Sequence, residues 1–115
     1  MTIAEVRDTL NATVLTENSD LAREVHAACG SDMMSDVLAY VKDQAVLVTG
    51  LNNPQVVRTA DMMDMVCIVF VRGKTPDEMI LKLADERCIA VLRSEMTMFT
   101  ACGLLYEKGL RGGKT

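Results

Sequence analysis

Three short apolar segments after residue 44 are rich in valine and isoleucine and do not alternate with polar residues. They cover residues 45–48, 66–71 and 89–92. Segments of this length are too short for ordinary helices, and strands that are apolar on both faces are typical of a sheet covered by helices on both sides. The pattern therefore predicts three strands buried on both faces.

Helical spacing of apolar residues follows each of these strands. The predicted helix starts are Asn53 with Pro54, Thr75 as an N-cap with Glu78 three residues later, and Ser94 as the N-cap of a helix that runs to residue 106. The alternation of strands and helices leaves room for right-handed crossover connections. We expect the three strands to be parallel.

The first third of the chain has a less regular pattern. It predicts a helix over residues 2–10 capped by Thr2, a short strand over 13–16, a helix over 20–28 and a further helix capped by Ser31. The buried stripe of that last helix is predicted to be Met33, Met34, Val37, Leu38 and Val41. Together the segments predict one α/β domain over residues 1–115, a mostly parallel sheet of about four strands covered by about six helices.

Charge and hydropathy exclude some partners. The 115 residues carry 12 Lys and Arg against 16 Asp and Glu, a net charge of −4, which lacks the basic footprint of a nucleic-acid-binding protein. The longest purely apolar segment, 65–71, falls far short of the roughly 20 residues that span a bilayer. With no secretory signal in the sequence, we expect a cytoplasmic protein that binds neither nucleic acid nor membrane.

The four cysteines do not form a metal-binding pattern. Cys29, Cys67, Cys88 and Cys102 are far apart in sequence, no CxxC pair occurs, and His26 is the single histidine. Cys67 lies inside one apolar segment and Cys88 just before another, as a small buried hydrophobe would. We expect reduced structural thiols, with no metal and no cofactor; a metal site is the weaker alternative.

No set of catalytic residues stands out. The carboxylate pairs at Asp32 and Asp36 and at Asp61 and Asp64 lack histidine partners, and we interpret them as solvated faces. The ending 112–115 (GGKT) resembles the end of a phosphate-binding P-loop but fails its pattern, because Lys108 stands where the first glycine is required. The sequence therefore predicts neither a kinase site nor an enzyme.

Two loops combine glycine with polar or cationic groups at predicted strand ends. Residues 49–53 lead into the helix that carries Gln55 and Arg58, and residues 72–75 contain Arg72 and Lys74. Ligands of open parallel sheets bind at such strand ends, where a phosphate or carboxylate can be held. The alternative interpretation is structural, with glycines for tight turns, polar caps and solvated charges.

Four segments resemble the DRTGG-domain family. They are residues 31–39 (SDMMSDVLA), 48–60 (VTGLNNPQVVRTA), 71–76 (VRGKTP) and 98–106 (MFTACGLLY), and the likeness extends over nearly the whole chain. One departure lies in the Thr-Gly-Gly element, of which Thr49 and Gly50 remain while Leu51 takes the second glycine position. No Asp-Arg pair precedes it.

The resemblance implies a fold like the N-terminal domain of HPr kinase/phosphorylase. It also implies an accessory or regulatory module, since such domains occur beside CBS domains in some inorganic pyrophosphatases and often self-associate. The surface that the resemblance makes most worth testing for ligand binding consists of Thr49, Gly50, Asn53, Gln55, Arg58 and Lys74.

The leading hypothesis is a non-catalytic regulatory module that forms a homodimer and either senses a small anionic ligand or docks to an enzyme. Methionines at helical spacing, namely Met33, Met34, Met62 and Met63, are the candidates for the subunit contact. The alternative hypothesis is a small enzyme or phosphotransfer accessory that uses the loop over residues 49–58.

Overall fold

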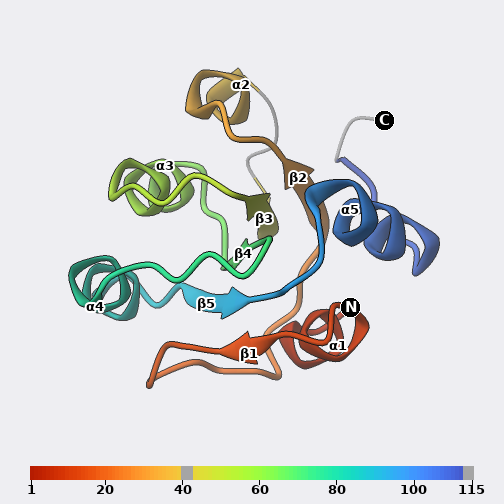
Figure 1. Cartoon of the computed structure of the whole chain (residues 1–115), viewed down its shortest axis with the longest axis horizontal. Coiled ribbons are helices and arrows are strands. Elements are labelled where there is room, and N and C mark those ends of the chain that lie inside the picture. The colour runs from red at the N-terminus through yellow and green to blue at the C-terminus, as the bar shows by residue number, and fades with distance from the viewer. Residues whose placement is uncertain (40–42, 113–115) are drawn as a thin grey trace.

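Five strands form one sheet in the computed structural model, which describes residues 1–39 and 43–112 (Figure 1). The strands are β1 (Thr13–Val14), β2 (Ala27–Gly30), β3 (Ala45–Thr49), β4 (Cys67–Phe70) and β5 (Ala90–Arg93). The helices are α1 (Ile3–Thr9), α2 (Met34–Ala39), α3 (Gln55–Met62), α4 (Glu78–Glu86) and α5 (Met98–Glu107). α1 and α5 lie on one side of the sheet and α2, α3 and α4 on the other (Figure 1). The described residues form an α/β fold.

The sheet is mostly parallel, as the sequence predicted, but it is mixed and has five strands instead of about four, and the described residues form five helices instead of about six. The strand order is β1-β5-β4-β3-β2. The strands from β2 to β5 are parallel, but β1 is antiparallel to β5, with Thr13 opposite Arg93. A tight turn at Asn11, with φ of 49°, links α1 to β1 at this edge of the sheet.

The helix that the sequence predicted over residues 20–28 is wrong, because β2 begins within this segment. Val25 and Ala27 are buried while His26 between them is exposed, which is the two-residue period of a strand. Ala27 to Gly30 pair in parallel with the first four residues of β3. These small residues have little strand propensity of their own, so pairing with a long buried strand determines their conformation.

Two apolar layers hold the helices to the sheet. Val46, Val48 and Val69 face α1 and α5, while Leu47 and Ile68 face α2, α3 and α4. Because successive side chains of a strand point to opposite faces, strands that are buried on both sides need the unbroken apolar segments seen in the sequence. The three buried strands are confirmed.

The helix starts are confirmed in part. Thr2 caps α1 as predicted, and its hydroxyl accepts a hydrogen bond from the Glu5 amide. α4 is capped by Asp77 and α5 by Thr97, not by Thr75 and Ser94 as the sequence predicted. Each true cap directly precedes the first helical residue, where its oxygen can reach an unpaired amide of the first turn.

Ser94 has a different role from the predicted one, because it is buried and joins two elements. Its hydroxyl donates to the Leu10 carbonyl at 2.8 Å, at the end of α1, and accepts from the Met96 amide at 3.2 Å. The residue therefore stabilises the loop after β5 instead of starting α5.

The predictions for the methionines and cysteines are also confirmed only in part. Met33 and Met62 are exposed, but Met63 belongs to the core at 2% exposure and cannot form a subunit contact. Cys67 is buried as predicted, whereas Cys88 is exposed because it forms the positive-φ turn that ends α4. Val41 and the ending 113–115 lie outside the described residues. In the part of the chain that the structure describes, no helix is long and apolar enough to cross a membrane.

Candidate functional site

The four parallel strands end at one edge of the sheet, and the loops that follow them lie together there. In open parallel sheets, ligands bind outside the carboxyl ends of the strands. The loops begin directly after Gly30, Thr49, Phe70 and Arg93. We use "carboxyl edge" for residues 31–32, 49–53, 71–75 and 94–97.

Asp32 joins the first two loops of the carboxyl edge. Its Oδ1 accepts a hydrogen bond from the Gly50 amide at 2.6 Å and one from the Thr49 hydroxyl at 3.1 Å. The Thr49 hydroxyl, fully buried, in turn accepts from the Leu51 amide at 3.1 Å. The carboxylate is therefore held by a backbone amide and a hydroxyl, a pair of donors that suits any anionic oxygen.

Arg72 brings a positive charge to the same place. It has a φ of 57°, in the left-handed region that non-glycine residues rarely adopt. Its amide donates to the Met96 carbonyl at 2.7 Å, which ties the loop after β4 to the loop after β5. Its guanidinium lies over Gly50, where a Cβ would stand only 2.2 Å from Nη2, and Nη2 is 4.0 Å from Asp32 Oδ2. Strained backbone of this kind is concentrated at functional sites.

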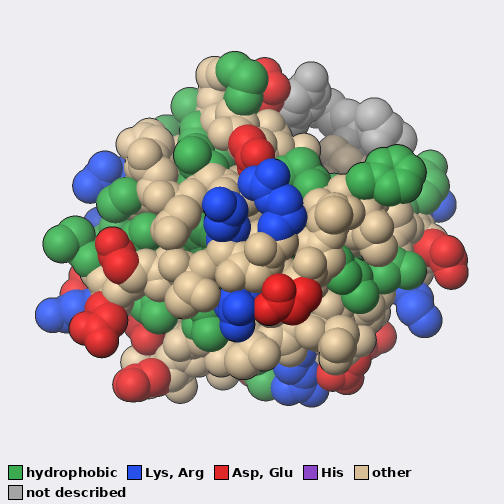
Figure 2. Space-filling view, viewed as in Figure 1, with side chains coloured by type: hydrophobic (Ala, Val, Ile, Leu, Met, Phe, Trp, Pro, Cys, Tyr) green, Lys and Arg blue, Asp and Glu red, His purple; other side chains and the backbone are tan. Residues whose placement is uncertain are grey.

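A second charged pair fixes the loop after β4 from its other side. Arg93 donates from Nε to the Gly73 carbonyl at 3.0 Å and from Nη2 to Glu95 Oε1 at 2.9 Å. Gly73 is also left-handed, with φ of 65°, and a Cβ there would come within 2.4 Å of Glu95 Oε2. Figure 2 shows positive and negative side chains gathered at the centre of one face, over β3 to β5 in the shared view.

The carboxyl edge thus presents amide, hydroxyl and guanidinium donors around one carboxylate. The DRTGG domain family matches residues 5–107 of the chain. The chain belongs to the DRTGG domain family.

Among the curated proteins, none matches this DRTGG domain. Its fold is similar to a solved structure of the CBS and DRTGG domains of the regulatory region of Clostridium perfringens pyrophosphatase, complexed with the activator diadenosine tetraphosphate. The TM-score is 0.76 and the sequences are 18% identical, over 90% of this chain and 45% of that chain. This chain therefore spans less than half of the neighbour's length, and at this identity the likeness shows the fold alone.

Of the residues predicted for the site, four belong to the carboxyl edge, and three of these have side chains or backbone that can face a ligand. Thr49 and Gly50 contact Asp32, and Lys74 is exposed in the loop after β4. Lys74 makes no ion pair within residues 1–39 and 43–112. Its ammonium group is available to an incoming anion.

The other three predicted residues have local or separate roles. Asn53 Oδ1 accepts from the Gln55 amide at 2.8 Å, so it fixes the start of α3. Gln55 is exposed on the first turn of that helix. Arg58 lines a groove between α3 and α4 together with Met62 and Arg87, and the structure does not bring it to the Asp32 contacts.

Two residues organise the carboxyl edge of the DRTGG domain. Sequence reasoning missed Asp32, and it named Arg72 as a cation of a strand-end loop but left it out of the residues chosen for testing. Asp32 was interpreted as half of a solvated pair with Asp36 because the segment before it was predicted to be helical. Had Ala27–Gly30 been recognised as a strand, Asp32 would have stood two residues beyond a strand end. Arg72 lay in a predicted loop, but its left-handed backbone has no signal in the residue type.

Burial affects three thiols of the DRTGG domain. Burial raises the pKa of the Cys67 thiol. The pKa values of Cys29 and Cys102, both half-buried, are raised first of all by burial as well. A protonated thiol is a poor nucleophile and a poor metal ligand. Within residues 1–39 and 43–112, no group of three His, Cys, Asp or Glu side chains could hold a metal ion.

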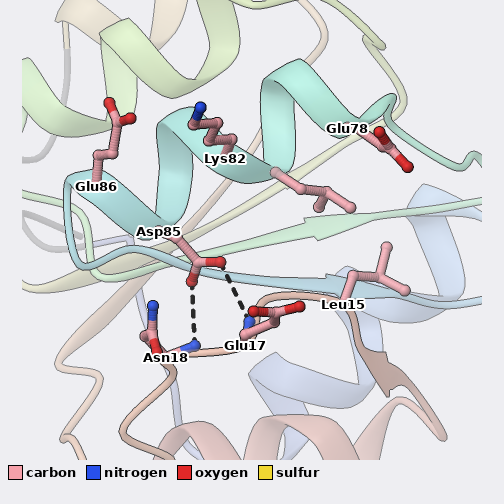
Figure 3. Close-up of a pocket in the computed structure, with 8 residues that line it drawn as sticks. Leu15, Glu17, Asn18, Glu78, Lys82, Asp85 and Glu86 are labelled. Atoms are coloured by element: carbon pink, nitrogen blue, oxygen red, sulfur yellow. Dashed lines mark hydrogen bonds between the residues drawn. The ribbon is translucent and has the colours of Figure 1, made fainter.

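A hollow of about 590 Å³ lies away from the carboxyl edge, between α4 and the loop after β1. Glu17, Glu78, Asp85 and Glu86 make its lining acidic, with Lys82 as its positive group. Figure 3 shows the Asp85 carboxylate directed at the loop, where it accepts from the amides of Glu17 and Asn18 at 3.2 Å each. Those hydrogen bonds anchor the loop to α4.

Proposed function

We propose that this DRTGG domain is a non-catalytic regulatory module that binds a small phosphate-bearing ligand at the carboxyl edge. The observation that carries the proposal is the convergence of the Gly50 amide, the Thr49 hydroxyl and the Arg72 guanidinium on one anionic group, Asp32. Lys74 adds an exposed positive charge in the next loop. Such donors are the groups that hold phosphates in α/β proteins.

The structural neighbour supports the same class of ligand. It is a regulatory region of an enzyme, and its complex contains a nucleotide activator with four phosphates. By analogy we propose that this chain, over residues 1–115, also serves as a sensor for an enzyme partner and binds a nucleotide or another phosphate ester in the cytoplasm.

Binding fits the carboxyl edge better than turnover does. Asp32 Oδ1, the carboxylate oxygen nearest the donors, already accepts two hydrogen bonds, so it is poorly placed as a general base. The alternative of a phosphotransfer accessory used the segment from Thr49 to Arg58 as one site. Arg58 lines a groove between α3 and α4, and we therefore favour binding at the carboxyl edge over a site made of that whole segment.

Isothermal titration calorimetry of the full chain tests the proposal, with ATP, diadenosine tetraphosphate and inorganic phosphate as probes. We expect at least one probe to bind, and Arg72→Ala to weaken it by about 10- to 100-fold, the value of a hydrogen bond to a charged group. Arg58→Ala is the matched control, because it removes an exposed arginine of the groove between α3 and α4. Equal affinity in the wild type and Arg72→Ala would refute this site.

Self-association is the second part of the proposal, and the exposed face of α5 supports it. Phe99 and Tyr106 are 87% and 60% exposed, although the chain has only four aromatic residues. Between them, a Cβ added at Gly103 would meet nothing within 4 Å. Figure 2 shows hydrophobic side chains on the surface over α5. Two such faces related by a two-fold axis through Gly103 would place Phe99 of each copy near Tyr106 of the other.

Multi-angle light scattering distinguishes this face from the predicted methionine surface. We expect a dimer that Phe99→Glu converts to a monomer, because a carboxylate buried between two copies is costly. Met62→Glu, on the opposite side of the sheet, should leave the dimer intact. If Met62→Glu dissociates it and Phe99→Glu does not, the contact lies on the helices α2 to α4 instead.

A further inference from the structure

We propose that Asp32 occupies the place of a ligand phosphate and closes the binding site until a ligand displaces it. This inference rests on the proposed function, since it concerns the same donors. It adds a residue that controls the apparent affinity of the site and explains why the carboxyl edge, though rich in donors, carries its own carboxylate.

The geometry at Asp32 is that of a bound anion. The Gly50 amide approaches Oδ1 at 2.6 Å, shorter than an ordinary amide hydrogen bond and typical of a charged acceptor. The Thr49 hydroxyl donates to the same oxygen, while Oδ2 faces Arg72 at 4.0 Å. A phosphate needs these same three groups, so the ligand and the Asp32 carboxylate exclude each other.

The carboxylate is held in a way that permits its release. The side chain of Asp32 remains 47% exposed, and that of Arg72 51% exposed, so their contact across 4.0 Å is weakly attractive in water. The neighbouring residue is fixed independently, because the Ser31 amide donates to the Val48 carbonyl at 3.0 Å. Rotation of the Asp32 side chain into water would open the donors without unpairing β2 from β3.

The Thr49 and Gly50 donors, by contrast, cannot move away with it. Thr49 is fully buried at the end of β3, and its hydroxyl also accepts from the Leu51 amide. Gly50 is buried beneath the Arg72 guanidinium. A ligand can bind only to those molecules in which the carboxylate has moved out. The apparent affinity is therefore the intrinsic affinity of the donors multiplied by the fraction of such molecules.

Calorimetry with ATP and inorganic phosphate as probes tests the inference on three variants of the full chain. Asp32→Asn keeps the shape but removes the charge, and Asp32→Ala removes the competing oxygen. Both should bind the probes about 5- to 50-fold more tightly than the wild type, with Asp32→Ala the tighter of the two. Asp36→Asn, an exposed carboxylate on α2, makes the same change in net charge and should alter the affinity less than twofold.

A second measurement reports on the donors directly. In ¹H–¹⁵N spectra, the Gly50 amide proton should resonate far downfield in the wild type because of its short hydrogen bond to a carboxylate. In Asp32→Ala it should move upfield, and added inorganic phosphate should move it downfield again. An upfield signal in the wild type, or one that Asp32→Ala does not change, overturns the inference.

The outcomes separate the two proposals. If the wild type binds a probe through Arg72 and the Asp32 variants bind it equally or more weakly, the site is real but Asp32 does not close it. Equal gains in Asp32→Asn and Asp36→Asn mean that net charge alone is responsible, which also overturns the inference. If neither the wild type nor any Asp32 variant binds ATP, diadenosine tetraphosphate or phosphate, the proposed function fails and the inference with it.

Discussion

The carboxyl edge and the acidic hollow beside α4 each contain a carboxylate that accepts two hydrogen bonds, yet the groups around the two carboxylates differ. At the carboxyl edge, main-chain and side-chain donors converge on one carboxylate, Asp32, which is half exposed. In the hollow, both oxygens of the Asp85 carboxylate accept hydrogen bonds from backbone amides of one loop. The hollow has a volume of about 590 Å³, but its remaining carboxylates would repel a phosphate, so volume alone does not identify a ligand site.

The difference also concerns what each feature does for the fold. Asp85 is separated in sequence from its two partners, Glu17 and Asn18, by 68 and 67 positions. Its hydrogen bonds therefore stabilise the packing of α4 against a distant loop. The contacts of Asp32 lie between two loops whose strands are already paired over four residues. A hydrogen-bonded carboxylate that the fold does not require is the better candidate for a functional group.

Gly50→Ala should have the largest effect on ligand binding at the carboxyl edge. The new Cβ would lie 2.2 Å from Arg72 Nη2, so the guanidinium must leave its position over the carboxyl edge. Because the colliding group is the end of a flexible side chain, stability should change by less than about 1 kcal/mol. Ligand affinity should fall by about 10- to 100-fold, as for Arg72→Ala, because the charged hydrogen bond is lost. Calorimetry and urea unfolding measure the two effects separately.

A matched control for that change is Gly103→Ala. A Cβ on Gly103 meets nothing within 4 Å, so neither ligand binding nor the packing of the monomer should suffer. If Gly50→Ala binds the probes like the wild type, Arg72 does not contact the ligand.

Thr49→Val should have the next largest effect, and it acts on stability as well as on binding. The buried hydroxyl donates to Asp32 and accepts from the Leu51 amide, so its removal leaves that amide unsatisfied. We expect a loss of about 1–3 kcal/mol in the free energy of unfolding. Thr49→Ser retains the hydroxyl and should recover part of the loss in urea unfolding and most of the ligand affinity. Probe affinity equal to the wild type in Thr49→Val would show that this hydroxyl is not part of the site.

The sequence predicted the centre of this fold better than its edges, for a physical reason. The strands β3, β4 and β5 are buried on both faces, so each must be an unbroken apolar segment, and such segments are visible in the sequence. β2 consists of small residues, Ala27–Gly30, that become a strand only through pairing with β3. No local pattern encodes a pairing between segments that are distant in sequence.

The candidate site followed from the fold in the same way. Thr49, Gly50 and Lys74 were predicted because they follow central strands that were recognised. Asp32 was missed because it follows the strand that was not recognised. Asn53 was correctly placed at a helix start, but its oxygen is used within the loop, and spacing alone cannot tell a cap from a ligand-binding group.

Asp85→Ala tests the role of the acidic hollow. It removes the carboxylate that holds the Glu17 and Asn18 amides, and it should lower the free energy of unfolding by about 1–2 kcal/mol. Probe affinity at the carboxyl edge should stay within twofold of the wild type. Glu86→Ala, in the same hollow and exposed, is the control and should change neither stability nor binding. A large loss of affinity in Asp85→Ala would mean that the hollow, not the carboxyl edge, binds the probes.

Arg72→Gly should have the smallest effect on the free energy of unfolding. It distinguishes an arginine that serves the turn from one that serves ligand binding. The φ of 57° at this position strains an L-residue by about 1–2 kcal/mol, whereas glycine adopts it freely, at the cost of greater chain entropy when unfolded. We therefore expect Arg72→Gly to be about 0.5–1 kcal/mol more stable in urea than Arg72→Ala.

Cys88, with φ of 58° and away from the carboxyl edge, provides the control. Cys88→Gly should gain a similar stability over Cys88→Ala while its affinity for the probes stays at the wild-type value. Arg72→Gly should combine its gain with the loss of binding. That combination would show that the strained backbone at Arg72 is retained for the position of its guanidinium over Gly50; a glycine variant that still binds the probes would show that the strain serves the turn alone.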